Sequence, residues 1–75
     1  MIRKVVNELK TIRVNKKITH DKLSGITRIS QKHISNIENH KTIPSIETLQ
    51  KLARGLGVKI RIEILDESNS KVVGE

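Results

Sequence analysis

The spacing of aliphatic residues along the chain predicts four helices followed by one strand. Near the start, aliphatic side chains recur at intervals of three and four, with Lys and Arg between them. They are Ile2, Val5, Val6, Leu9 and Ile12. This period is that of one helical face, so we expect a helix over roughly residues 2–14. Shorter helices are expected over about 20–27 and 31–39, and a fourth from residue 46, with an apolar stripe of Ile46, Leu49, Leu52, Ala53 and Leu56.

Polar residues that favour helix starts stand before three of these segments. Thr19, Ser30 and Ser45 each directly precede a helical pattern, and their hydroxyls are suited to accept from the first free backbone N–H groups. Gly57 follows the last helix and is expected to adopt the left-handed conformation that ends it. The small residues Ser24 and Gly25 indicate a place where another helix can cross closely.

The hydrophobic period changes after residue 57. In "VKIRIEIL", Val58, Ile60, Ile62 and Ile64 alternate with charged residues, and period two with β-branched side chains predicts a half-buried strand. The chain is therefore divided into a helical domain at 1–57, a strand at 58–66 and a polar tail at 67–75.

Composition narrows the class of protein. The 75 residues contain no Cys, Phe, Tyr or Trp, which excludes disulfides, thiolate metal sites and aromatic base-stacking platforms. The apolar runs are short and the N-terminus lacks a signal-peptide core, so we expect a cytoplasmic protein with no membrane partner. The net charge of +7 and the pI near 10.2 indicate a polyanionic partner more than they indicate simple solubility.

The segment expected to form the third helix carries its polar groups on one side. Ile34 and Ile37 share one face, and Gln31, Lys32, Ser35 and Asn36 project from the other. Gln and Asn amides match the edge of adenine in the major groove, and Lys matches that of guanine. A solvated polar face is the plainer interpretation of the same pattern.

Two short helices joined by a tight turn, followed by a loop to another helix, form the helix-turn-helix plan. The chain resembles the lambda-repressor-like, Cro-type (XRE family) DNA-binding domains over about residues 2–57. The resemblance is carried by Arg13 and by "THDKLS", "ISQKHISNIENH" and "PSIETLQKLARGLG". It implies an all-α, four- to five-helix lambda-repressor-like domain, to which this chain adds a C-terminal β-strand for dimerisation.

Four positions depart from the family pattern. His20 stands where Gln opens the second helix, and Ser24 replaces Ala. Arg28 and His40 stand where Gly is usual, and a left-handed backbone there costs a non-Gly residue about 1 kcal/mol. Arg28 and His40 also add donors that can reach phosphate.

The resemblance assigns roles residue by residue. Base reading is expected from Gln31, Lys32, Ser35 and Asn36. Phosphate contacts are expected from His20, Arg28, His33, Asn39, Lys41 and Thr42, although Asn39 also fits a simple helix cap. Arg13 and Glu38 are expected to form a structural ion pair, because an unpaired carboxylate on this helix would repel phosphate.

A lone strand leaves backbone groups unpaired, so we expect it to pair with the same strand of a second copy. The dimer interface would comprise Val58, Ile60, Ile62 and Ile64. A hairpin with residues 71–73 is the other arrangement that the sequence allows.

The expected function is a sequence-specific transcriptional regulator, a repressor that binds a palindromic operator in double-stranded DNA as a homodimer. The alternative is an antitoxin of a toxin–antitoxin operon, HipB-like in plan, which binds its operator and a toxin protein. A scaffold module that binds only protein is a third class. His20, His33 and His40 lack metal-ligand spacing, and no catalytic triad is visible, so we expect no enzyme activity, cofactor or metal.

Overall fold

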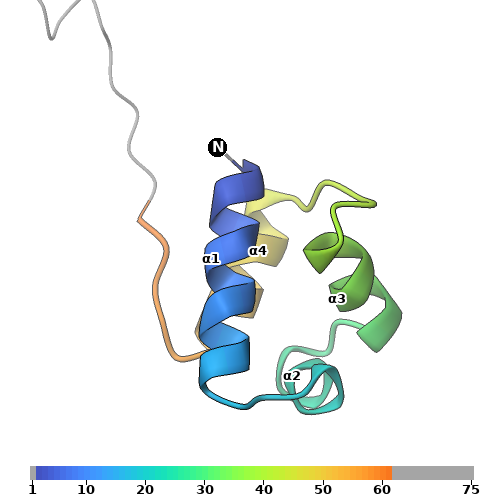
Figure 1. Cartoon of the computed structure of the whole chain (residues 1–75), viewed down its shortest axis with the longest axis vertical. Coiled ribbons are helices and arrows are strands. Elements are labelled where there is room, and N and C mark those ends of the chain that lie inside the picture. The colour runs from blue at the N-terminus through green and yellow to red at the C-terminus, as the bar shows by residue number, and fades with distance from the viewer. Residues whose placement is uncertain (1, 62–75) are drawn as a thin grey trace, which may run out of the picture.

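The computed structural model describes residues 2–61, which contain four helices and no strand. They are α1 (Ile2–Asn15), α2 (His20–Thr27), α3 (Gln31–Glu38) and α4 (Ile46–Gly55), shown in Figure 1. The predicted helices are confirmed with small shifts at their ends. The third helix stops at Glu38 rather than 39, because Asn39 has left helical geometry and caps it.

An aliphatic core holds the helices together. Its most buried large side chains are Leu23, Ile34 and Ile37, each at most 1% exposed. The other members come from α1 and from α4 with its cap, namely Val6, Leu9, Leu49, Leu52, Ala53 and Leu56. Burying one Leu or Ile side chain contributes roughly 1.5–3 kcal/mol, which suffices to build a small domain without aromatic residues.

The three predicted N-caps are confirmed. The hydroxyls of Thr19, Ser30 and Ser45 accept from the backbone N–H groups three residues on, at 3.0, 3.1 and 3.1 Å. Each cap contributes about 1 kcal/mol. The caps therefore fix where α2, α3 and α4 begin, and with that the direction in which each helix points.

The helices pack as two crossing pairs. α1 lies beside α4, and α2 lies at an angle to α3 (Figure 1), while α2 also packs on α4 and α3 on α1. The close crossing occurs at Gly55 of α4, where an added Cβ would meet Thr27 Cγ2 at 2.6 Å. The expectation of a close crossing at Gly25 is wrong, because nothing lies within 4 Å of a Cβ built there.

Tight turns with positive φ link the elements. Arg28 and His40 adopt left-handed geometry, with φ of 66° and 61°, where the family pattern has Gly. Gly57 does so with φ of 78°, as predicted. Lys17 has φ of 59° and was not anticipated, because no Gly or Asn marks that position. The chain thus keeps the expected turns with strained residues in place of glycine.

The described part of the predicted strand, residues 58–61, has no strand geometry in this single chain. The Val58 N–H donates to the Ala53 carbonyl oxygen at 2.9 Å, and Val58 and Ile60 pack partly buried against the core. The rest of the predicted strand, including Ile62 and Ile64, lies outside the described residues, as does the tail at 67–75.

Candidate nucleic-acid interface

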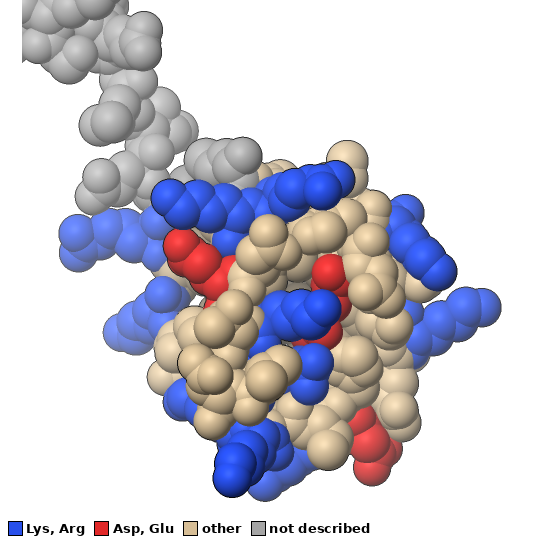
Figure 2. All heavy atoms as spheres, viewed as in Figure 1, with Lys and Arg blue, Asp and Glu red and all other residues tan. Residues whose placement is uncertain are grey.

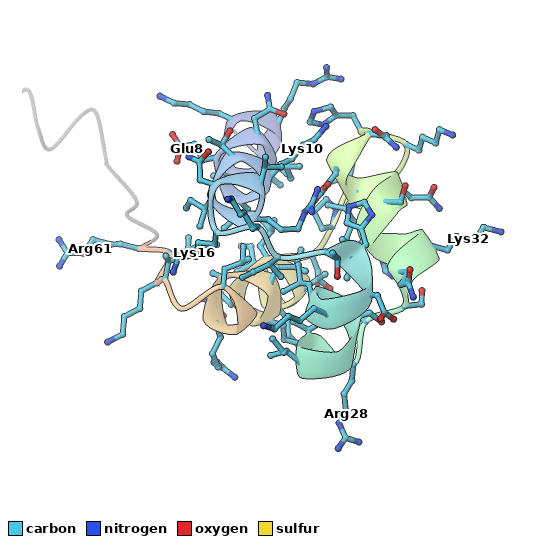
Figure 3. The ribbon with its side chains drawn as sticks, turned by 60° about the horizontal axis from the view of Figure 1, so that its bottom comes forward. Glu8, Lys10, Lys16, Arg28, Lys32 and Arg61 are labelled. Atoms are coloured by element: carbon cyan, nitrogen blue, oxygen red, sulfur yellow. The ribbon has the colours of Figure 1, made fainter. Side chains whose placement is uncertain are left out.

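The polar face of α3 is held outward by the residues behind it. Ile34 and Ile37 are 0% and 1% exposed, so the helix cannot rotate about its axis without exposing them. Gln31 and Lys32 are exposed on the other side, and Ser35 and Asn36 are partly exposed. Figure 3 shows Lys32 projecting away from the body of the domain. All four predicted base-reading residues therefore lie on one helix, with their side chains accessible to differing degrees.

A shallow, open depression joins α3 to the loop that follows it. It is lined by Ser30, Lys32, His33, Asn36 and Thr42. The structure thus brings two predicted base readers, Lys32 and Asn36, together with two predicted phosphate contacts, His33 and Thr42. Thr42, in the loop after α3, thus lies beside residues six to twelve positions earlier in the chain.

The other predicted phosphate contacts lie around this helix. Arg28 occupies the left-handed position after α2 and extends outward (Figure 3). Lys41 is exposed in the loop after α3. Asn39 is the C-cap of α3, and its Nδ2 donates to Ser35 Oγ at 3.3 Å. Asn39 therefore caps α3 and still has an exposed side chain.

His20 is turned toward the protein. Its Nε2 lies 2.8 Å from Glu38 Oε1. An ionised carboxylate can only accept, so the ring hydrogen must sit on Nε2, and a neutral imidazole then carries no second N–H. The expected phosphate contact from His20 therefore requires the imidazolium form, whose Nδ1–H is free to donate.

The carboxylate of Glu38 is buried and gathers donors from two other elements. Arg13 Nε and Nη2 donate to its two oxygens at 2.7 and 3.0 Å, and Arg13 Nη1 donates to the Ile18 carbonyl oxygen at 2.7 Å. Burial raises the pKa of Glu38, but hydrogen bonds from Arg13 and His20 and their charges outweigh it, so the pKa lies below its usual value. Glu38 therefore stays ionised and faces inward, toward Arg13 of α1 and His20 of α2.

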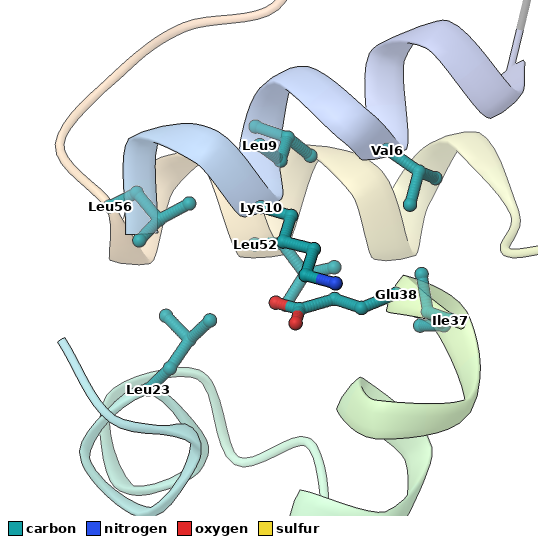
Figure 4. A pocket seen from close by; sticks show the side chains of 8 residues that line it. All are labelled: Val6, Leu9, Lys10, Leu23, Ile37, Glu38, Leu52 and Leu56. Atoms are coloured by element: carbon teal, nitrogen blue, oxygen red, sulfur yellow. The ribbon is translucent and has the colours of Figure 1, made fainter. Parts of the chain in front are cut away.

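Figure 4 shows that the same carboxylate reaches the edge of the apolar core. A small pocket there is lined mainly by core side chains from all four helices and the end of α4, with Lys10 and Glu38 as its charged members. The pocket is too small and too apolar to suggest a ligand. Its position explains why burial opposes the ionisation of Glu38.

Three further polar contacts were missed by sequence reasoning. Gln31 Nε2 donates to Asp21 Oδ1 at 2.9 Å, His40 Nε2 lies 2.9 Å from Asn7 Oδ1, and Lys16 Nζ donates to the Leu56 carbonyl oxygen at 2.8 Å. In the first contact the acid is ten positions from Gln31, and an acid in the first turn of a helix is favoured by the helix dipole whether or not it has such a partner. The other two join residues more than thirty positions apart, which no local pattern reveals.

Basic side chains outnumber acidic ones, with 15 Lys and Arg against 8 Asp and Glu in the sequence. Figure 2 shows Lys and Arg around much of one face, with few Asp or Glu among them. Within residues 2–61, no group of His, Asp or Glu is arranged to hold a metal ion. No helix in this part of the chain has the length and apolar character needed to cross a membrane. The chemistry that this surface offers is hydrogen bonding and attraction of anions.

A capped pair of short helices, α2 and α3, with the second one exposing a polar face beside basic loops, defines a helix-turn-helix DNA-binding domain. A comparison with family models supports this at the level of sequence: the model described as "Helix-turn-helix" matches residues 9–62. The chain belongs to this helix-turn-helix family of the XRE type, whose members are DNA-binding transcriptional regulators. Searches of curated proteins and of solved structures gave no significant match.

Proposed function

We propose that the protein is a sequence-specific transcriptional repressor that places α3 in the major groove of a palindromic operator as a homodimer. One observation carries the proposal: the polar face of α3 is fixed from behind by the fully buried Ile34 and Ile37. In helix-turn-helix proteins the N-terminal half of the second helix reaches base edges. Gln31 and Lys32 occupy that half, and Asn36 and Ser35 follow one turn later.

Affinity would come mainly from phosphate contacts around α3. Arg28, His33, Asn39, Lys41 and Thr42 surround the helix, and His20 would join them in its charged form. If about six phosphates were neutralised, log K would fall with log salt at a slope near −5. The slope would give the number of phosphates contacted, and replacing one contacting cation of this face should make it shallower by about 0.9.

The homodimer is inferred from the pattern of residues 58–66. Val58 and Ile60 turn one side toward the core, while Lys59 is exposed. Antiparallel pairing of eight residues from each copy would satisfy the backbone groups along one edge of each segment and would form a ladder roughly 26 Å long. A two-fold axis there would place two recognition helices about one DNA turn, roughly 34 Å, apart.

Selection of bound sequences from random duplex DNA tests this function directly. We expect a palindrome, with preference at particular base pairs that Gln31→Ala and Asn36→Ala each relax without loss of fold. Glu47→Gln is the matched control, because Glu47 is an exposed residue in the first turn of α4. If both α3 variants keep the same base preference, Gln31 and Asn36 do not read bases. If the protein binds no DNA, the proposed repressor function is wrong.

The second candidate is an antitoxin that binds both an operator and a toxin protein. It is favoured by two exposed aliphatic side chains close in sequence, Ile43 at 83% and Ile46 at 51% exposed. Such residues suit a protein contact better than a DNA backbone. We expect an antitoxin to copurify at fixed stoichiometry with the product of an adjacent gene, and Ile43→Ser with Ile46→Ser to weaken that complex but not operator binding. If the double variant still forms the complex, Ile43 and Ile46 are not part of the toxin-binding surface.

A further inference from the structure

The side chain of Gln31 is hydrogen-bonded to a side chain of another helix. Its Nε2 donates to Oδ1 of Asp21 at 2.9 Å, which links the first turn of α3 to the first turn of α2. Both residues are exposed, on the side where the polar face of α3 begins. The negative charge of Asp21 opposes the approach of DNA phosphate to this side of the domain.

The chemistry of the two groups decides which end of the amide faces Asp21. An ionised carboxylate accepts hydrogen bonds and donates none, so only the amide nitrogen of Gln31 can face it. The oxygen and nitrogen of a terminal amide lie on opposite sides of its carbon. The contact therefore directs Oε1 away from Asp21 and leaves one N–H of Nε2 unused.

We propose that Asp21 is a specificity-determining positioning residue, which holds Gln31 so that it presents an acceptor to the major groove and thereby selects adenine. The inference rests on the proposed role of α3 in base reading. Adenine offers an N6 donor for Oε1 and an N7 acceptor for the remaining N–H. Guanine and thymine offer acceptors at the corresponding positions, which face the fixed Oε1 with like polarity.

The attraction of an acid to a helix N-terminus is a rival explanation for Asp21. It accounts for an acid in the first turn of α2, and equally for Glu47 in the first turn of α4. It does not require contact with a side chain of the recognition helix. The two explanations predict different base preferences for a variant that loses the charge of Asp21 but can still form a hydrogen bond with Gln31.

Asp21→Asn makes that change. The Asn amide can accept from Gln31 Nε2 or, rotated, donate to Gln31 Oε1, so Gln31 becomes free to present either end. The measurement is the relative affinity of the full-length protein for four operators that differ only at the base pair where Gln31→Ala alters preference. We expect Asp21→Asn to reduce the preference for adenine over guanine and thymine there by about fivefold, the value of about 1 kcal/mol of readout. Preference at the pair read by Asn36 should stay unchanged.

Glu47→Gln controls for the loss of one acid at a helix start, which changes affinity for all sequences equally. If Asp21→Asn behaves as Glu47→Gln does, with base preference intact at the pair that Gln31→Ala relaxes, the positioning role is refuted while base reading by α3 stands. If Gln31→Ala itself leaves every base preference intact, base reading by Gln31 and the positioning inference fall together. A melting curve of each variant separates these results from a loss of fold.

Discussion

Glu38 of α3 holds Arg13 of α1 through two hydrogen bonds, from Nε at 2.7 Å and from Nη2 at 3.0 Å. The side chain of Arg13 is only 13% exposed and that of Glu38 only 9%, so the pair is shielded from water on most sides. Arg13 also caps the turn before α2 through the Ile18 carbonyl oxygen. This one arginine therefore ties α1 to the end of the recognition helix and to the start of the helix-turn-helix.

Arg13→Ala is expected to destabilise the fold by about 3 kcal/mol, because it leaves a buried carboxylate without its main partner. Chemical denaturation at pH 7 measures this free energy of unfolding. Arg3→Ala, at an exposed site on the same helix, is the control and should change stability by less than about 0.5 kcal/mol. If the two variants lose the same free energy of unfolding, the Arg13–Glu38 pair does not contribute to stability.

The lowered pKa of Glu38 predicts a loss of stability in acid. A carboxylate whose pKa is lower in the folded than in the unfolded state stabilises the fold above its unfolded pKa, near 4.5. That stabilisation disappears as the pH falls through the folded value. The free energy of unfolding should therefore decrease below about pH 4.5 more steeply in the natural protein than in Glu38→Gln. Parallel curves for the two proteins would contradict this assignment.

Arg28 has a strained backbone and a proposed contact with DNA phosphate. Arg28→Gly tests both, because stability reports the strain and the salt dependence of binding reports the contact. The φ of 66° at Arg28 is relieved by Gly, so we expect stability to rise by about 1 kcal/mol. Loss of one phosphate contact should also reduce the salt slope of operator binding by about 0.9. Lys17→Gly, which relieves a φ of 59° outside the proposed interface, should stabilise without altering the slope. A full salt slope in Arg28→Gly would mean that Arg28 does not touch DNA.

Local patterns predicted the helices, their caps and most of the apolar stripe of α4, because each depends on residues within a few positions. Ser30, for example, caps α3 through the N–H of His33, three residues away. Ile46, the first member of that stripe, is wrong as a core residue, since it is 51% exposed at the start of the helix. The left-handed turns at Arg28 and His40 were anticipated from the family pattern alone, since neither residue favours positive φ. Lys17, with no such pattern behind it, was missed.

Contacts between side chains of different elements could not be predicted in the same way. His20 was expected to face phosphate, yet its Nε2 contacts Glu38, eighteen positions away in the chain. Gln31 was expected to read a base, and in the structure it also donates to Asp21. In both cases the sequence identified a polar residue near the interface, and only the crossing of α2 and α3 determined its partner.

The crossing of α2 and α4 provides a matched pair of glycine substitutions. Gly55→Ala would place Cβ 2.6 Å from Thr27 Cγ2 and 3.1 Å from Leu23 Cδ1, so we expect destabilisation of about 1–3 kcal/mol. Gly25→Ala, with open space around its Cβ, should stabilise α2 by about 0.5–1 kcal/mol. Thermal melting of both variants measures the difference.

Thr27→Ser gives a sharper test of the same crossing. It removes Cγ2 and keeps the hydroxyl, which donates to the Leu23 carbonyl oxygen at 2.8 Å. In that background Gly55→Ala should cost clearly less than it does alone. An unchanged cost would mean that the close approach to Thr27 is not what requires glycine at position 55.

The proposed dimer predicts that Ile60→Lys or Ile62→Lys gives monomers with weak operator binding. A charge in the apolar side of the paired segments would be buried between two copies, and loss of bivalent attachment would weaken binding by about a hundredfold or more. Lys59→Gln is the control, because it changes the net charge by one unit at an exposed position on the other side of the segment. Sedimentation equilibrium measures the association, and melting curves are needed beside it because Ile60 also packs against the core. An Ile62→Lys protein that still sediments as a dimer would show that the two copies meet elsewhere, and operator binding by that variant would then be expected to stay close to that of the natural protein.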